Sequence, residues 1–135
     1  MTMLEKARDI AEKAHAGQKR KNGEPYINHV IRVSEAAGKY GEDAAIVRML
    51  HDVIEDSTVT LGDLQISGFS NDIVSAIAWI SKTKNQTYRG YIINIKQYGG
   101  HIALIVKLCD LADNLNGATG TLKDKYEMAK WILEH

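Results

Sequence analysis

The segment His51–Asp56 carries four polar side chains whose types and spacing could do chemistry. On a helix, successive residues are turned by about 100°, so that relative to His51 Glu55 falls near ~40° and Asp52 near ~100°. Asp56 follows near ~140°, whereas the apolar residues of the same stretch lie between ~160° and ~300°. One imidazole and three carboxylates therefore share one face of the predicted helix.

Two interpretations of this face are open. It could be the solvated side of an ordinary amphipathic helix. It could also be part of a metal site, because imidazole nitrogen and carboxylate oxygen together suit manganese, iron, zinc or magnesium. The adjacent pair His51 and Asp52 cannot fill the coordination sphere of such an ion, so the metal hypothesis requires further ligands elsewhere in the chain.

Two residues are candidates for these additional ligands. His29 lies in a predicted helix, where a single histidine is more often structural than ligating. Asp110 lies within the apolar run Ile102–Leu115, and a carboxylate buried alone is costly unless a cation or strong hydrogen bonds compensate it. A metal would supply that compensation, as would a salt bridge to Lys107 or a helix N-terminus. Asn114, one turn after Asp110, shares its face.

Apolar residues recur with helical spacing along nearly the whole chain, so we predict an all-α fold, a compact multi-helix bundle. Strand signals are weak, and the residues from Lys82 to Gln86 form a polar connector. Thr60 and Ser70 are expected to cap helices. The expected helices cover residues 4–16, 25–37, 42–54, 60–64, 70–80, 88–98, 102–115 and 122–132.

The length of 135 residues suits a single domain, which we assign to residues 1–132. Residues 133–135, Leu-Glu-His, look like the remnant of a C-terminal expression tag. The only cysteine, Cys109, cannot form an internal disulfide, and the charged N-terminus does not resemble a signal peptide. No segment has the apolar length of a membrane span. These features predict a cytoplasmic protein that does not enter a membrane.

Cationic and acidic residues are equal in number, 17 each, so the formal net charge is zero. A neutral chain has no general attraction for nucleic acid, and we expect no nucleic-acid partner. The cations Lys19, Arg20 and Lys21 gather in a single polar loop, which on charge alone is most simply a solvated basic loop. An anionic ligand would have to be held by a few placed groups or by a metal.

Three segments, taken in order, resemble the motifs of the hydrolase domains of RelA/SpoT homologues, which belong to the HD superfamily. They are residues 17–29 (GQKRKNGEPYINH), 50–57 (LHDVIEDS) and 106–115 (VKLCDLADNL). The His-Asp doublet alone is a weak signal, but three motifs in order with matching flanks are specific. The chain departs from the family pattern at Val30, which replaces a proline, and at Leu111–Asp113, which replaces a basic residue and a second histidine.

The resemblance implies one divalent metal, most often manganese, bound by four side chains: His29, His51, Asp52 and Asp110. Glu55 and Asp56 match the family's catalytic acid pair, which would orient or deprotonate the attacking water and assist the leaving group. Three further residues match its substrate contacts: Arg20, Lys21 and Asn114.

The implied reaction is metal-dependent removal of the 3′-pyrophosphate from guanosine tetra- or pentaphosphate. Two alternatives remain open at this point. The chain could be an HD-type nucleotide phosphatase of other or broader specificity, or a non-catalytic nucleotide-binding module that keeps the fold. The sequence leaves the oligomeric state open.

Overall fold

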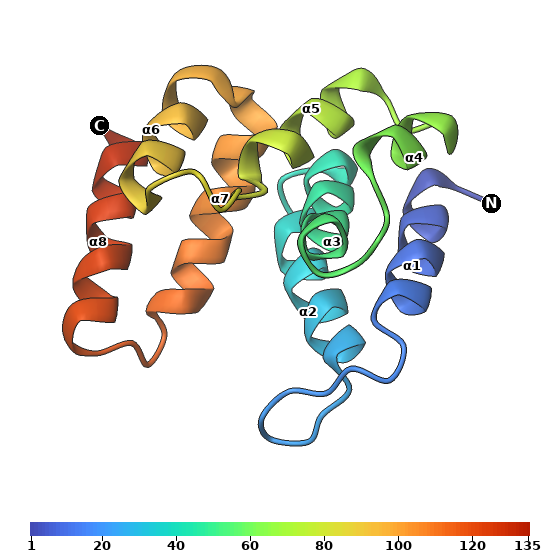
Figure 1. Ribbon diagram of the computed structural model, residues 1–135, viewed down its shortest axis with the longest axis horizontal. Coiled ribbons are helices and arrows are strands. Elements are labelled where there is room, and N and C mark those ends of the chain that lie inside the picture. The colour runs from blue at the N-terminus through green and yellow to red at the C-terminus, as the bar shows by residue number, and fades with distance from the viewer.

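The computed structural model describes residues 1–135 and consists of helices joined by short connections (Figure 1). The only β-type pairing is an isolated bridge between Lys19 and Pro25. The all-α prediction is therefore confirmed. The eight helices are α1 (Met3–Ala14), α2 (Tyr26–Gly38), α3 (Glu42–Asp56), α4 (Leu61–Ile66), α5 (Asn71–Ile80), α6 (Tyr88–Tyr98), α7 (Gly100–Leu115) and α8 (Gly120–Glu134).

Side-chain caps fix where several of these helices begin. The Thr60 hydroxyl accepts a hydrogen bond from Asp63 N–H (3.1 Å), and the Asp63 carboxylate accepts one from Thr60 N–H (2.9 Å), which completes a capping box. Ser70 caps α5 by accepting from Ile73 N–H (3.2 Å). Both predicted caps are thus confirmed, because Ser and Thr satisfy amide groups that a helix start leaves unpaired.

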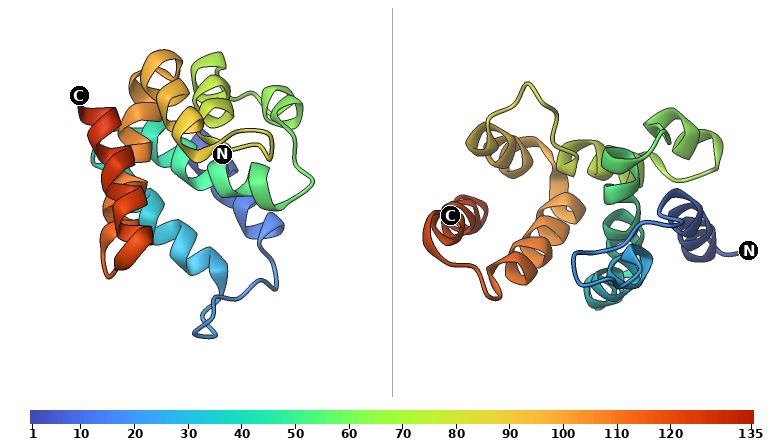
Figure 2. Two further views of the ribbon diagram at one scale, coloured as in Figure 1. Left: turned by 60° about the vertical axis from the view of Figure 1, so that its left-hand side comes forward. Right: turned by 60° about the horizontal axis from the view of Figure 1, so that its bottom comes forward.

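Helix α3 lies at the centre of the molecule. It packs against α1, α2, α5 and α7, and every residue of its stretch Ala44–Val53 is buried. Helices α6 and α8 pack against α7 on the other side, so that α1–α5 form one group and α6–α8 a second (Figures 1 and 2). One continuous apolar cluster connects the two groups.

The corner between α6 and α7 depends on two consecutive glycines. Gly100 has a φ of +82°, a conformation that residues with a Cβ rarely adopt. A Cβ at Gly99 would lie 2.7 Å from the carbonyl oxygen of Ile95. Glycine at both positions lets the chain reverse abruptly and brings α7 against α3, where it contributes to the site described below.

Four helices, α2, α3, α4 and α8, extend one or two residues beyond their expected ends. Helix α3 continues to Asp56, two residues past the expected Ile54, so that Glu55 and Asp56 lie in its last turn. Helix α8 runs to Glu134, and Leu133 is only 1% exposed. Leu133 is therefore part of the packed core, and the assignment of residues 133–135 to a tag stays a prediction. None of the eight helices combines the length and the apolar character that a bilayer span requires.

Candidate active site

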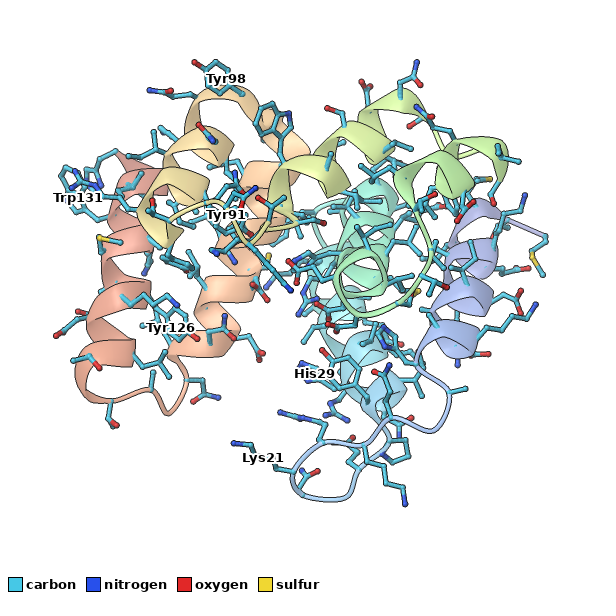
Figure 3. All side chains as sticks on the ribbon, viewed as in Figure 1. Lys21, His29, Tyr91, Tyr98, Tyr126 and Trp131 are labelled. Carbon is cyan, nitrogen blue, oxygen red and sulfur yellow. The ribbon has the colours of Figure 1, made fainter.

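A cleft of about 650 Å³ lies where α2, α3, α6, α7 and α8 meet, next to the connector between α5 and α6. Figure 3 shows its centre, with His29 on one side, Tyr126 of α8 on the other and Tyr91 above. Clefts of this volume are typical of small-molecule sites. Six of the nine predicted site residues line it: His29, His51, Asp52, Glu55, Asp110 and Asn114.

The most compact group of potential ligands in the cleft consists of His51, Asp52 and Glu55. One ligand atom from each of these side chains lies within 4.8 Å of the other two. His51 Nε2 is 3.3 Å from Glu55 Oε1, and His51 Nδ1 is 3.5 Å from Asp52 Oδ1. His51 and Asp52 are 6% and 8% exposed, which excludes a fully solvated face.

His51 Nδ1 is buried without a hydrogen-bond partner. Buried nitrogen atoms are nearly always paired, so an orphaned one beside a carboxylate needs an explanation. A cation held between His51 and Asp52 would provide it. The chemistry of this donor set therefore fits a divalent metal.

Two hydrogen-bond donors hold the Asp52 carboxylate in place beside His51. The Tyr26 hydroxyl donates to Asp52 Oδ2 (3.2 Å), and so does Arg48 Nη1 (3.2 Å). Burial and the negative charge of Asp52 raise the pKa of the Tyr26 phenol well above its usual range, so that Tyr26 remains a donor. These contacts orient the carboxylate toward the cleft, as expected for the partners of a metal ligand.

Asp110 is one turn from the middle of α7 and is bound by two cations. Lys107 Nζ lies 3.1 Å from its Oδ2, and Arg48 Nη2 lies 3.1 Å from its Oδ1. Burial would raise the pKa of Asp110, but Lys107 and Arg48 outweigh it and hold this pKa below its ordinary value. The salt bridge to Lys107 that the sequence left as an alternative is thus present, and ligation by Asp110 stays a prediction.

His29 faces the same cleft from α2 but lies outside the compact ligand group. Its ring packs against Tyr26, with 5.8 Å between ring centroids. Burial, followed by the positive charges of Arg20 and Arg48, lowers the pKa of His29 below its ordinary value. The ring is therefore neutral at neutral pH, which is the form that binds a metal.

The two residues of the predicted acid pair lie differently. Glu55 lines the cleft, and its Oε1 accepts a hydrogen bond from Lys82 N–H (3.0 Å). Asp56 does not line the cleft. Burial and the nearby charges of Asp52 and Glu55 raise the pKa of Asp56 above its ordinary value.

Arg20 and Lys21 also lie outside the main cleft. They line a separate shallow hollow on the loop between α1 and α2, and this hollow shares Tyr26 with the cleft. Figure 3 shows Lys21 at the end of that loop, on the same side of the molecule as His29. Arg20 is partly neutralised by Glu24, at 3.6 Å, so that Lys21 is the freer of the two charges.

Comparison with known proteins identifies the family. The sequence profile of the HD domain matches residues 7–91, more than half of the chain. The chain belongs to the HD domain family.

Curated relatives agree with this assignment. A guanosine-3′,5′-bis(diphosphate) 3′-pyrophosphohydrolase of Borreliella burgdorferi is 43% identical to the chain. The match covers 57% of the chain and 12% of the relative. The chain is 34% identical to the bifunctional (p)ppGpp synthase/hydrolase SpoT of Escherichia coli K12 over 64% of the chain and 12% of the relative. A GTP pyrophosphokinase of Streptomyces coelicolor is 28% identical over 94% of the chain and 16% of the relative. The chain thus spans about a sixth or less of these relatives.

HD domains use divalent metals, and the His51, Asp52 and Glu55 group could hold one. The cleft of this HD domain also contains residues that sequence reasoning did not assign. Besides Arg48, four lysines line it, together with four tyrosines: Lys82, Lys84, Lys107, Lys125, Tyr26, Tyr88, Tyr91 and Tyr126. Five cations face three carboxylates there, so that a neutral chain presents a positive cleft. Such a cleft favours an anionic ligand.

Arg48 is the overlooked residue that the helical wheel could have revealed. Three residues before His51, it falls near ~60° on that wheel, between Glu55 and Asp52. A charge on the functional face, within a stretch that is otherwise apolar, is a detectable signal. The lysines and tyrosines come from segments separated in sequence, and no local pattern brings them together.

Proposed function

We propose that the chain is a metal-dependent (p)ppGpp 3′-pyrophosphohydrolase. The observation that carries this proposal is the convergence of six predicted site residues, from three helices, on one positively charged cleft. The relatives support this substrate, since several are named guanosine-3′,5′-bis(diphosphate) 3′-pyrophosphohydrolases. A reducing, cytoplasmic setting suits the single cysteine and remains part of the proposal.

The proposed metal ligands are His29, His51, Asp52 and Asp110, and we propose manganese as the ion. Bound there, the metal would lower the pKa of a water molecule and neutralise phosphoryl charge. Oxygen and imidazole ligands suit manganese, although the ligand types alone do not select it over iron or zinc. Tyr26 and Arg48 position the Asp52 carboxylate, and burial keeps His29 neutral for binding.

Glu55 is the residue best placed to accept the proton of the attacking water. Its carboxylate lies one turn from His51, at the cleft, and is held by the Lys82 amide. About a third of the side chain is exposed, so that water reaches it. Asp56, whose raised pKa favours the protonated form, would assist the leaving oxygen as an acid after a small movement toward the cleft.

The cationic and aromatic residues of the cleft would bind the nucleotide. Lys82 and Lys84 on the connector, Lys107 on α7 and Lys125 on α8 can neutralise phosphate charges. A tyrosine face can stack on a guanine base, as aromatic side chains do with exposed bases. Asn114 offers amide hydrogen bonds to the ribose, and Arg20 and Lys21 extend the positive surface past Tyr26.

The decisive experiment measures pyrophosphate release from ppGpp by metal-stripped protein, with and without added Mn²⁺, beside a panel of ordinary nucleotides. Manganese-dependent release from ppGpp alone is expected. Phosphate release from the other nucleotides would replace the proposal with a broader nucleotide phosphatase. Binding of ppGpp without turnover would indicate a non-catalytic module.

A further inference from the structure

Arg48 is a buried cation in the middle of the proposed metal site. Its side chain is 4% exposed, with Nη1 3.2 Å from Asp52 Oδ2 and Nη2 3.1 Å from Asp110 Oδ1. The two carboxylates belong to different helices, α3 and α7, so that one guanidinium joins the two helix groups that form the cleft. Both carboxylates are also among the proposed metal ligands.

The buried charges around Arg48 balance without a bound ion. Lys107 contacts Asp110 as well, so that two cations face two carboxylates. A divalent ion bound by these carboxylates and by neutral imidazoles would add two positive charges that nothing in this buried group compensates. Uncompensated charge in a poorly solvated site is costly, so that metal binding and the present position of Arg48 oppose each other.

The guanidinium cannot relieve this conflict by losing its proton, because arginine stays protonated in proteins. When a metal binds, the charge of Arg48 therefore stays beside the ion and repels it. Arg48 binds Oδ2 of Asp52, whereas Asp52 Oδ1 lies 3.5 Å from His51 Nδ1, so the guanidinium and an ion can use different oxygen atoms of the same carboxylate.

We propose that the buried charge of Arg48 lowers the metal affinity of this site. Arg48 joins Asp52 and Asp110 through hydrogen bonds, and its fixed positive charge repels a divalent ion bound by the same two side chains. This inference rests on the metal ligands of the proposed function. It adds that a residue which positions two of these ligands also limits how tightly they hold the ion.

The test compares Mn²⁺ binding by isothermal titration calorimetry among metal-free wild type, Arg48→Met and the control Arg8→Met. Arg8 is paired with Glu12 at the same spacing of four residues (2.9 Å) but on the exposed side of α1. We expect Arg48→Met to bind Mn²⁺ about tenfold more tightly or better, because one opposing charge is removed. Arg8→Met should match wild type. An unchanged or weaker affinity in folded Arg48→Met would overturn the proposal.

Thermal unfolding supplies a second readout. Without metal, Arg48→Met leaves Asp52 and Asp110 with too little positive charge, so its Tm should fall by about 10 °C and recover in saturating Mn²⁺. If Arg48→Met does not fold even with Mn²⁺, Arg48→Gln takes its place. Glutamine also removes the charge but can still donate a hydrogen bond to a carboxylate, so Mn²⁺ should bind more tightly than to wild type, and equal or weaker affinity would overturn the inference.

These outcomes separate the inference from the proposed reaction. If neither the wild-type protein nor any variant binds Mn²⁺, the proposed effect of Arg48 on metal affinity and the proposed ligand set are both wrong. If Arg48→Met binds Mn²⁺ more tightly while no protein releases pyrophosphate from ppGpp, the role of Arg48 stands and only the proposed reaction fails.

Discussion

The two sides of the cleft differ in chemistry and in how far the family match covers them. The acidic wall, which consists of His29, His51, Asp52 and Glu55, comes from α2 and α3 and lies wholly within the matched residues 7–91. The basic wall consists of Lys82, Lys84, Lys107 and Lys125, and its last two residues lie beyond the match. Glu55 and three of the four proposed metal ligands therefore lie in the part matched by the family, whereas Asp110 and half of the basic wall lie beyond it.

This contrast predicts that changes in the acidic wall abolish catalysis, while changes in the basic wall alter substrate affinity. The largest effect is expected from His51→Ala. It removes a proposed ligand whose buried Nδ1 has no hydrogen-bond partner, so that Mn²⁺ should no longer bind. Pyrophosphate release from ppGpp should fall to background. Metal content after dialysis and a pyrophosphate assay measure the two effects, and retention of one Mn²⁺ per chain would remove His51 from the ligand set.

Glu55→Gln should separate metal binding from proton transfer within the acidic wall. The amide oxygen can still accept the hydrogen bond from Lys82 N–H, so the local structure should persist. Loss of the basic carboxylate should lower kcat by roughly 10²–10⁴-fold while Mn²⁺ affinity changes little. Steady-state kinetics and calorimetry on the same preparation test this. A variant that loses Mn²⁺ instead would show that Glu55 is a ligand, as its place in the compact group permits.

The acidic wall was also far easier to predict from sequence than the basic wall. His51, Asp52 and Glu55 lie within five consecutive residues, and the helical period alone places them on one face. The helix expected over residues 88–98 has these bounds in the structure, where α6 spans Tyr88–Tyr98. Local signals suffice for these three residues of α3, whereas His29 on α2 was assigned as a ligand only through the family resemblance.

The basic wall could not be predicted because its members share no local pattern. Lys82 and Lys84 look like ordinary residues of a polar connector, and Lys125 looks like any exposed lysine of α8. Only tertiary packing brings these three onto one cleft. The same limit applies to Asp56, whose helical angle suggested a cleft position that its place in the last turn of α3 does not provide.

A smaller effect is expected from Lys125→Met, which changes the basic wall alone. Lys125 lines the cleft and lies over the Tyr88 ring, 4.2 Å from its centroid. Loss of one charged contact to phosphate should raise KM for ppGpp about tenfold, with kcat and Mn²⁺ affinity unchanged. Lys123→Met is the matched control, since Lys123 pairs with Glu127 on the exposed side of α8 and does not line the cleft. Equal KM values for both variants would exclude Lys125 from substrate binding.

The smallest expected effect is a change in thermal stability when Asp56, next to the acidic wall, is replaced by asparagine. Burial and the charges of Asp52 and Glu55 raise the pKa of Asp56 in the folded protein above the value of 3.8 for a free side chain. The folded state thus binds the proton more tightly than the unfolded state, and ionised Asp56 destabilises the fold at every pH above its raised pKa. In metal-free buffer at pH 7, Asp56→Asn should raise Tm by about one or two degrees, because much of the repulsion is screened by solvent.

The gain in Asp56→Asn should shrink as the pH is lowered toward 3.8, because the wild-type carboxyl then becomes neutral as well. Asp124→Asn, which removes an exposed carboxylate of α8 outside the cleft, should not reproduce this pH-dependent gain. A lower Tm for Asp56→Asn at pH 7 would mean that Asp56 is stabilised by a cation rather than crowded by Asp52 and Glu55. In that case its role as a proton donor would lose its physical basis, and the acidic wall would act through Glu55 alone.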